Sequence, residues 1–224
     1  MTALVWDATG TRKYETGVKN CALYPYKTDG TGYDNGVAWN GITSITESPD
    51  GAEPTDLYAD DIKYATLRSA ETLGGTIEAY TYPDEWAECD GSKEAVTGVF
   101  VGQQSRKMFG LAYKTSLGDD TSSDVNGYKL HIVWAATASP SERQYETIND
   151  SPDAITFSWE YTTTAVAFTT EPYKAFKPTS LITIDSTKVD ATKLATLEAT
   201  LFGGSGQNAN PTLPTPDEVL AALA

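Results

Sequence analysis

The chain has 224 residues, enough for one domain of ordinary size that buries roughly 70% of its unfolded surface without metals or disulfides. Acidic residues outnumber basic ones by 31 to 16, giving a formal net charge of -15. Such a surface repels nucleic acid and anionic lipid, which argues against DNA binding by phosphate neutralisation. No apolar run approaches the ~20 residues of a membrane helix, and the N-terminus lacks the pattern of a secretory signal, so we expect folding in the cytoplasm and no membrane insertion.

Aromatic and β-branched residues recur in short runs separated by Gly, Pro, Asp and Asn, which predicts the strands and turns of an all-β domain. Cys21 and Cys89 lie in neither a CxxC nor another metal-ligand spacing, so we expect two buried thiols. The less regular runs predict strands, in chain order, at residues 18–24, 37–45, 62–68, 76–82, 99–101, 107–113 and 181–184.

The segment TESPDGAEPTDLYADD separates the second and third of these strands. It is too long for a tight hairpin and rich in acids, so we predict a long loop, functional or disordered, over residues 47–61. The strand that follows carries Ile62 and Tyr64 on one face and Ala65 and Leu67 on the other. We therefore expect a neighbouring subunit to cover this strand.

The two clearest strands lie further along the chain. In residues 128–134, apolar side chains alternate with Lys129 and His131, a period of two that predicts one buried and one polar face. The segment from residue 155 to 162 repeats the arrangement. Both are predicted core strands.

Helical signals are few. Asp190 is a suitable cap for a helix with Leu194, Leu197 and Leu201 along one stripe, which two glycines would end. A shorter helical turn is predicted from Pro83 to Glu88. The stretch GGSGQNANPTLPTP then predicts a flexible arm over residues 204–224, with the apolar tail DEVLAALA either frayed or docked on a partner. The β domain would thus span residues 1–203.

The sequence lacks the residues that the common catalytic motifs require. His131 is the single histidine, so no triad or histidine metal site can form, and we expect an ordinary surface residue. GTGYDNG does not open a helix as a dinucleotide fingerprint must, and no P-loop occurs. The oxygen-rich stretch from Asp120 to Asp124 lacks the glycine and glutamate of a calcium loop, which favours a polar hairpin loop. We expect no enzyme activity, no cofactor and no metal.

One alternative is left open by the segment PDEWAECDG, where Glu85 and Glu88 flank Trp86. Two carboxylates beside an aromatic ring are typical of glycosidases, although two acids are also typical of a helix start. A β-sandwich that binds carbohydrate through exposed Trp39, Trp86 or Tyr residues, or a hydrolase that uses the two glutamates, is therefore kept as an alternative.

Five stretches go further, because they resemble the major tail protein family of long, non-contractile-tailed bacteriophages. They are GVAWNGITSITESPDGAEPTDLYADDIKY, TIEAYTYPDEWAECDG, GQQSRKMFGLAYKTSLGDD, INDSPDAITFSWE and TSLITIDSTKVDATKLATLEATLFG. Together they extend the resemblance over residues 17–203. The resemblance implies a mainly β fold of two packed β-sheets, sandwich- or barrel-like, with a flanking helix.

The resemblance also implies a function without catalysis. Six copies would form a ring, and rings would stack into a hollow virion tail tube through which viral DNA passes without adhesion, with other tail proteins at the tube ends. Assembly would occur in the bacterial host cytoplasm. The loop over residues 47–61 would reach a neighbouring subunit, with intersubunit contacts expected at Glu53, Leu57, Tyr58, Ile62 and Tyr64. Another ring-forming virion or secretion-tube component is a second alternative.

Overall fold

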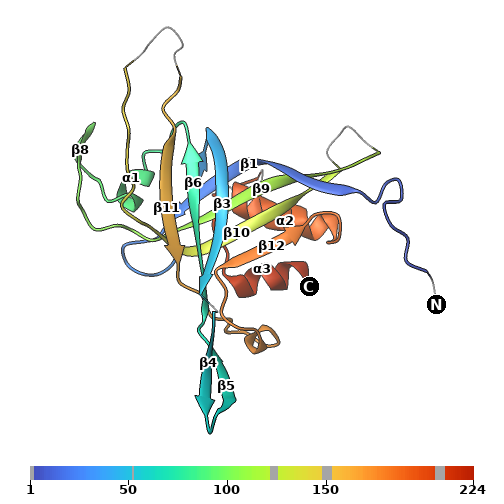
Figure 1. The fold of residues 1–224 in the computed structure, drawn as a ribbon. Helices are drawn as coiled ribbons and strands as arrows, with labels where there is room; N and C mark the ends of the chain where they lie inside the picture. The colour runs from blue at the N-terminus through green and yellow to red at the C-terminus, as the bar shows by residue number, and fades with distance from the viewer. Residues whose placement is uncertain (1–2, 52, 122–125, 148–152, 205–209) are drawn as a thin grey trace.

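The computed structural model describes residues 3–51, 53–121, 126–147, 153–204 and 210–224, and it is mainly β (Figure 1). The strands are β1 (Lys13–Pro25), β2 (Val37–Trp39), β3 (Ile42–Gly51), β4 (Pro54–Ala59), β5 (Ile62–Arg68), β6 (Glu71–Ala79), β7 (Lys93–Val96), β8 (Val99–Val101), β9 (Phe109–Asp119), β10 (Gly127–Ala138), β11 (Phe157–Thr163) and β12 (Leu181–Asp185). The helices are α1 (Trp86–Cys89), the 3-10 turn η1 (Tyr173–Ala175), α2 (Ala191–Phe202) and α3 (Pro216–Leu223). Among the described residues, no helix is both long and apolar enough to cross a membrane.

Strand β10 joins two halves of one antiparallel sheet. The strand order is β2-β1-β9-β10-β11-β6-β3, and β12 also pairs with β10. Residues up to Val133 pair with β9 and β12, Ala136 pairs with both β9 and β11, and Thr137 and Ala138 pair with β11. The register with β9 shifts between Val133 and Ala136, and Ala135 has a φ of 48°. Such a bulge bends a strand, and β3, β6 and β11 run across the direction of β1 and β9 in Figure 1. The expected fold of two packed sheets is confirmed.

Aromatic rings fill the space between the two halves. Trp39, Trp86 and Trp159 lie with ring centroids 4.6 to 5.6 Å apart, and all three are buried. Trp86 belongs to the short helix α1, which confirms the predicted helical turn near Pro83 and shows that its purpose is to insert a ring into the core. Cys21 and Cys89 lie in the same core as free thiols, and burial raises the pKa of each to about 12.

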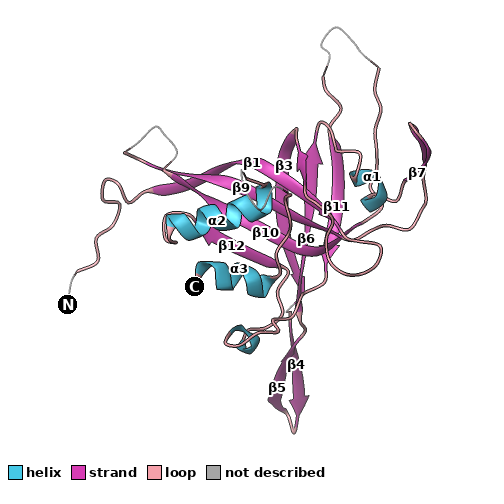
Figure 2. Ribbon diagram, turned by 180° about the vertical axis from the view of Figure 1, so that it is seen from behind, coloured by secondary structure: helices cyan, strands magenta, loops and turns pink. Residues whose placement is uncertain are grey.

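Helices α2 and α3 cover the outer face of the first half (Figure 2). Leu194, Leu197 and Leu201 are buried there, and the Asp190 carboxylate accepts the N–H groups of Thr192 and Lys193, so the predicted capped helix is confirmed. The second half covers the other face. Consequently β10 is buried on both faces, and the prediction of one polar face for residues 128–134 is wrong.

The flexible arm predicted for residues 204–224 is wrong from residue 210 onward, while residues 205–209 lie outside the described part. The Nε1–H of Trp134 donates to the Pro214 carbonyl at 2.8 Å, and Thr215 and Glu218 form a capping box at the start of α3. Val219 then packs, fully buried, into the helix-side core. Backbone hydrogen bonds and an apolar helix face outweigh the Gly, Asn and Pro content of the segment.

The long loop predicted over residues 47–61 is also wrong. Strand β3 continues to Gly51, and β4 and β5 form a hairpin that projects from the body (Figure 1). Ala59 pairs with Ile62, which leaves a two-residue turn in which Asp60 and Asp61 have φ values of 52° and 61°. Positive φ at both positions is the requirement of a type I′ turn, and Asp tolerates it. The strand predicted over residues 62–68 is confirmed as β5.

Gly75 provides a test of the packing of β6 against its neighbours β3 and β11. A Cβ at this position would lie 2.2 Å from the Thr46 carbonyl oxygen and 2.6 Å from the Tyr161 hydroxyl. We expect Gly75→Ala to lower the free energy of unfolding by about 1–3 kcal/mol, because the backbone of β3 must move. Chemical denaturation measures this difference. Gly102→Ala, whose added Cβ meets nothing within 4 Å, is the matched control and should change stability by less than about 0.5 kcal/mol; equal effects would contradict the packing argument.

Candidate functional site

The outer face of the second half is uncovered and polar. Register and strand alternation place one set of side chains on this face: Ser44, Thr46, Ser48 and Asp50 of β3, Thr72, Gly74, Thr76 and Glu78 of β6, and Ser158, Glu160 and Thr162 of β11. This set is called the polar sheet face below. It contains hydroxyls and carboxylates and no Lys or Arg, whereas the opposite face of the same strands carries Ile77, Trp159 and Tyr161 into the core.

The edges of this half are incompletely paired. In the described part of the chain, β3 pairs with β6 alone, so its outer edge carries backbone groups with no partner strand. At the other side, β11 pairs with β10 only through residues 161–163, and Ser139 and Ser141 bond to Glu160 beyond that point. Unpaired strand edges are sites where a strand from another chain can add.

The β4–β5 hairpin brings together the residues predicted for intersubunit contact. Leu57 and Tyr58 lie on β4, Ile62 and Tyr64 on β5, and Glu53 directly precedes β4. Tyr58, Ile62 and Tyr64 are 64 to 74% exposed, and Leu57 is 41% exposed. Leu67 of β5 is exposed as well. A two-stranded hairpin is marginally stable in water by itself, and this one presents a group of unburied apolar side chains.

Two further apolar surfaces were missed by sequence reasoning. Hairpin β7–β8 exposes Val96, Val99, Phe100 and Val101, and the extended N-terminal segment exposes residues 4–6, including Trp6 at 78%. The run VFV is indistinguishable in sequence from a buried strand, so only the three-dimensional structure shows that it faces outward. Exposed apolar groups of this size mark protein contacts.

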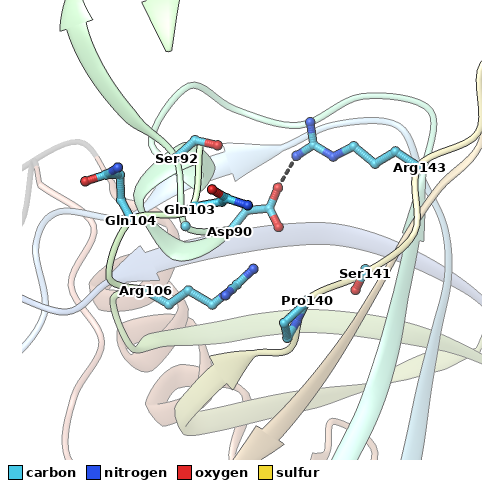
Figure 3. Close-up of a pocket in the computed structure, with 9 residues that line it drawn as sticks. Asp90, Ser92, Gln103, Gln104, Arg106, Pro140, Ser141 and Arg143 are labelled. Atoms are coloured by element: carbon cyan, nitrogen blue, oxygen red, sulfur yellow. Dashed lines mark hydrogen bonds and ion pairs between the residues drawn. The ribbon is translucent and has the colours of Figure 1, made fainter. Parts of the chain in front are cut away.

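A cleft lies at the base of β7–β8 (Figure 3). Its lining includes Arg106 and Arg143, with Asp90 as the one carboxylate. Arg143 points toward Asp90 and forms an ion pair with it. No nucleophile with an adjacent base lines this cleft, and no group of three or more metal-ligating side chains occurs among the described residues. Two guanidinium groups in one cleft are suited to holding an anionic group.

The side chains proposed for carbohydrate chemistry do not have the arrangement that sugar binding or hydrolysis by these residues would require. Trp39 and Trp86 are buried, so neither ring can stack on a sugar. Glu85 and Glu88 do line a common concave surface, together with Lys93 and other residues, but Glu88 forms an ion pair with Lys107. The part of this alternative that used exposed Trp39 and Trp86 is wrong, because both rings form the core between the sheets, whereas tyrosines such as Tyr58 and Tyr64 are exposed.

His131 is buried, contrary to the expectation of a surface residue, because the second half of the sheet covers its face of β10. Its ring stacks on Tyr113 with centroids 4.8 Å apart, its Nδ1 lies 3.1 Å from Glu47 Oε1, and its Nε2 lies 3.0 Å from Thr115 Oγ1. Tyr113 donates its O–H to Glu47 at 2.5 Å. Glu15 and Lys129 form an ion pair beside this group. The cluster therefore ties β1, β3, β9 and β10 together at one end of the sandwich.

The calcium candidate is only partly described. Asp120 accepts the Gly10 N–H, while residues 122–125 lie outside the described part of the chain.

Comparisons with known proteins leave these surfaces as the main guide to function. A scan against protein-family models and a search of curated protein sequences return no match to this chain.

Glu47 gives the cluster a testable pH dependence. Its hydrogen bond with His131 lowers its pKa below the ordinary value of 4.5, assisted by the Tyr113 hydroxyl and opposed by burial. Since a lowered pKa favours the folded state above pH 4.5, this stabilisation is lost as pH falls through the lowered value. We expect Glu47→Gln to cost about 1–2 kcal/mol at neutral pH and to differ less from wild type in acid. Denaturation at several pH values measures this.

Glu160→Gln, on the exposed face of β11, is the control for replacing a carboxylate with an amide and should change stability at neutral pH by less than about 0.5 kcal/mol. A constant difference between Glu47→Gln and wild type at all pH values would contradict the assignment.

Proposed function

We propose that this chain is a structural subunit of a bacteriophage tail tube, in which six copies form a ring and the rings stack around a channel for viral DNA. The observation that carries the proposal is the polar sheet face, an uncovered surface of a β-sandwich that holds hydroxyls and carboxylates without a cation. The resemblance of the sequence to phage major tail proteins points the same way. The subunit would be made in the host cytoplasm and meet other tail proteins at the tube ends.

The polar sheet face has the chemistry that a DNA channel requires. Asp50, Glu78 and Glu160 would repel phosphates at close range, with a screening length of ~8 Å in physiological salt. Short Ser, Thr and Gly side chains leave a flat wall with no base-stacking ring. DNA would pass such a wall without binding to it.

The unpaired edges support assembly into a closed ring. Edge-to-edge addition of the β3–β6–β11 half of one copy to that of the next would satisfy the free backbone groups of β3 and close the sheet into a cylinder, which removes strand edges altogether. The exposed apolar hairpins provide additional contact area between copies.

Electron microscopy of the concentrated purified protein tests the assembly. We expect smooth hollow tubes or rings of uniform diameter. A protein that remains monomeric at high concentration would contradict the proposal, and isolated trimers or globules would favour a different virion component.

DNA affinity tests which face lines the channel. We expect assembled wild-type tubes to show no micromolar affinity for short duplex DNA at physiological salt. Thr162→Lys adds a cation to the polar sheet face and should make the tubes retain DNA protected from nuclease, because phosphate neutralisation then becomes possible. Ala195→Lys, on the exposed side of α2, is the control and should give no protected DNA. Protection in both variants, or tight binding by the wild type, would overturn the assignment of this face.

A further inference from the structure

We infer that the end of the subunit formed by β7–β8 and the Arg106 cleft is a docking surface for the β4–β5 hairpin of a second copy in the adjacent ring. The inference rests on the proposed function and assigns which surface receives the projecting hairpin. Phe100 and Val99 would contact Tyr58 and Ile62, and Arg106 would face the acidic turn at Asp60 and Asp61.

Like the β4–β5 hairpin, the β7–β8 hairpin has apolar side chains that are not buried within the subunit. Every residue of both its strands is exposed, and the paired positions include Val96 opposite Val99 and Phe100 opposite Glu94. The hydrogen bond from the Gly98 N–H to Glu94 holds its turn. Isolated two-stranded hairpins are marginal in water, so these apolar side chains are exposed for a contact and contribute nothing to the core.

The two hairpins lie at opposite ends of the molecule (Figures 1 and 2). Strand β6 begins shortly after β5, and the chain leads from its other end to α1 and then β7; its nine residues span about 30 Å at ~3.3 Å per residue. A contact that joins opposite ends of identical subunits is heterologous, and it repeats indefinitely unless it closes. Stacked rings require such a donor surface on one side and an acceptor on the other.

The charged side chains of the acceptor end determine which kind of partner it can bind. Asp56 of the β4–β5 hairpin is paired with Lys63, so the turn residues Asp60 and Asp61 supply its outward negative charge. In the cleft, Arg143 is paired with Asp90, whereas the buried Nε of Arg106 has no hydrogen-bond partner among the described residues. A guanidinium whose Nε lacks a partner, in a chain of net charge -15, complements the acidic turn of a second copy.

The test uses Tyr58→Asp, which disables the donor hairpin, and Phe100→Asp, which disables the acceptor. Both replaced side chains are exposed, so folding is expected to be unaffected, and Ala195→Asp on α2 controls for the added charge. We expect the control to form tubes and each of the two variants to form rings without tubes. When rings of the two variants are mixed in equal amounts, one intact donor surface meets one intact acceptor surface. The expected product is pairs of rings that grow no further, seen by electron microscopy and sedimentation velocity.

Each other outcome decides against the inference. Normal tubes from Phe100→Asp, or a mixture that stays as single rings, would show that the two hairpins do not meet. Monomers from Phe100→Asp, with native circular dichroism, would place β7–β8 within the ring. Absence of any assembly by the wild type would instead count against the proposed function.

The charged part of the contact has its own variant pair. Asp61→Asn, which removes a charge and still tolerates the positive φ, and Arg106→Gln should each shorten tubes, and combining them in one chain should shorten them no further than the stronger single change, because both remove the same contact. A combined effect equal to the sum of the two single effects, when both single variants form rings, would remove Arg106 from the contact.

Discussion

The fold depends on one strand that is buried on both faces and shared by both layers. Leu130, Ile132 and Trp134 of β10 pack beneath the helices, whereas Val133 and Ala136 belong to the core between the sheets. The bulge at Ala135 sets the direction in which β11 leaves the first half. The Trp86 insertion, the docking of α2 and the covering of His131 all follow from this one bend.

The bend also separates the half of the sheet that is packed on both faces from the half that carries the proposed function. Both faces of the first half are used for packing, one against helices and one against the second half. In the described part of the large sheet, the outer face of β3, β6 and β11 is left open, and the β4–β5 hairpin and the α1–β7–β8 segment continue from the two ends of β6. The surfaces that carry the proposed function therefore lie on the half that contributes least to the core, where polar substitution costs little stability.

Local sequence patterns correctly predicted the helices and strands whose formation depends on short segments. The alternation in β10 and β11 and the leucine stripe of α2 gave correct elements, because period and capping are properties of short segments. Burial of His131 was missed because it depends on a strand more than 80 residues distant in sequence, as Glu47 of β3 shows. The β4–β5 turn was missed because Asp60 and Asp61 replace the usual Asn-Gly signal. The five predicted contact residues do gather on one hairpin, whereas Phe100 gave no sequence signal of its exposure.

The exposed apolar hairpins and the strongly acidic surface have opposite effects on the association of copies in solution. Net charge of one sign keeps copies apart, and apolar side chains such as Tyr58 and Phe100 favour their association. Salt shortens the range of the repulsion without weakening the apolar contact. The contact between Arg106 and the acidic turn is the exception, since it is attractive and salt weakens it. The charged contact would then set the orientation of the rings, and the apolar contact would set their affinity. This division of roles is expected at a protein interface.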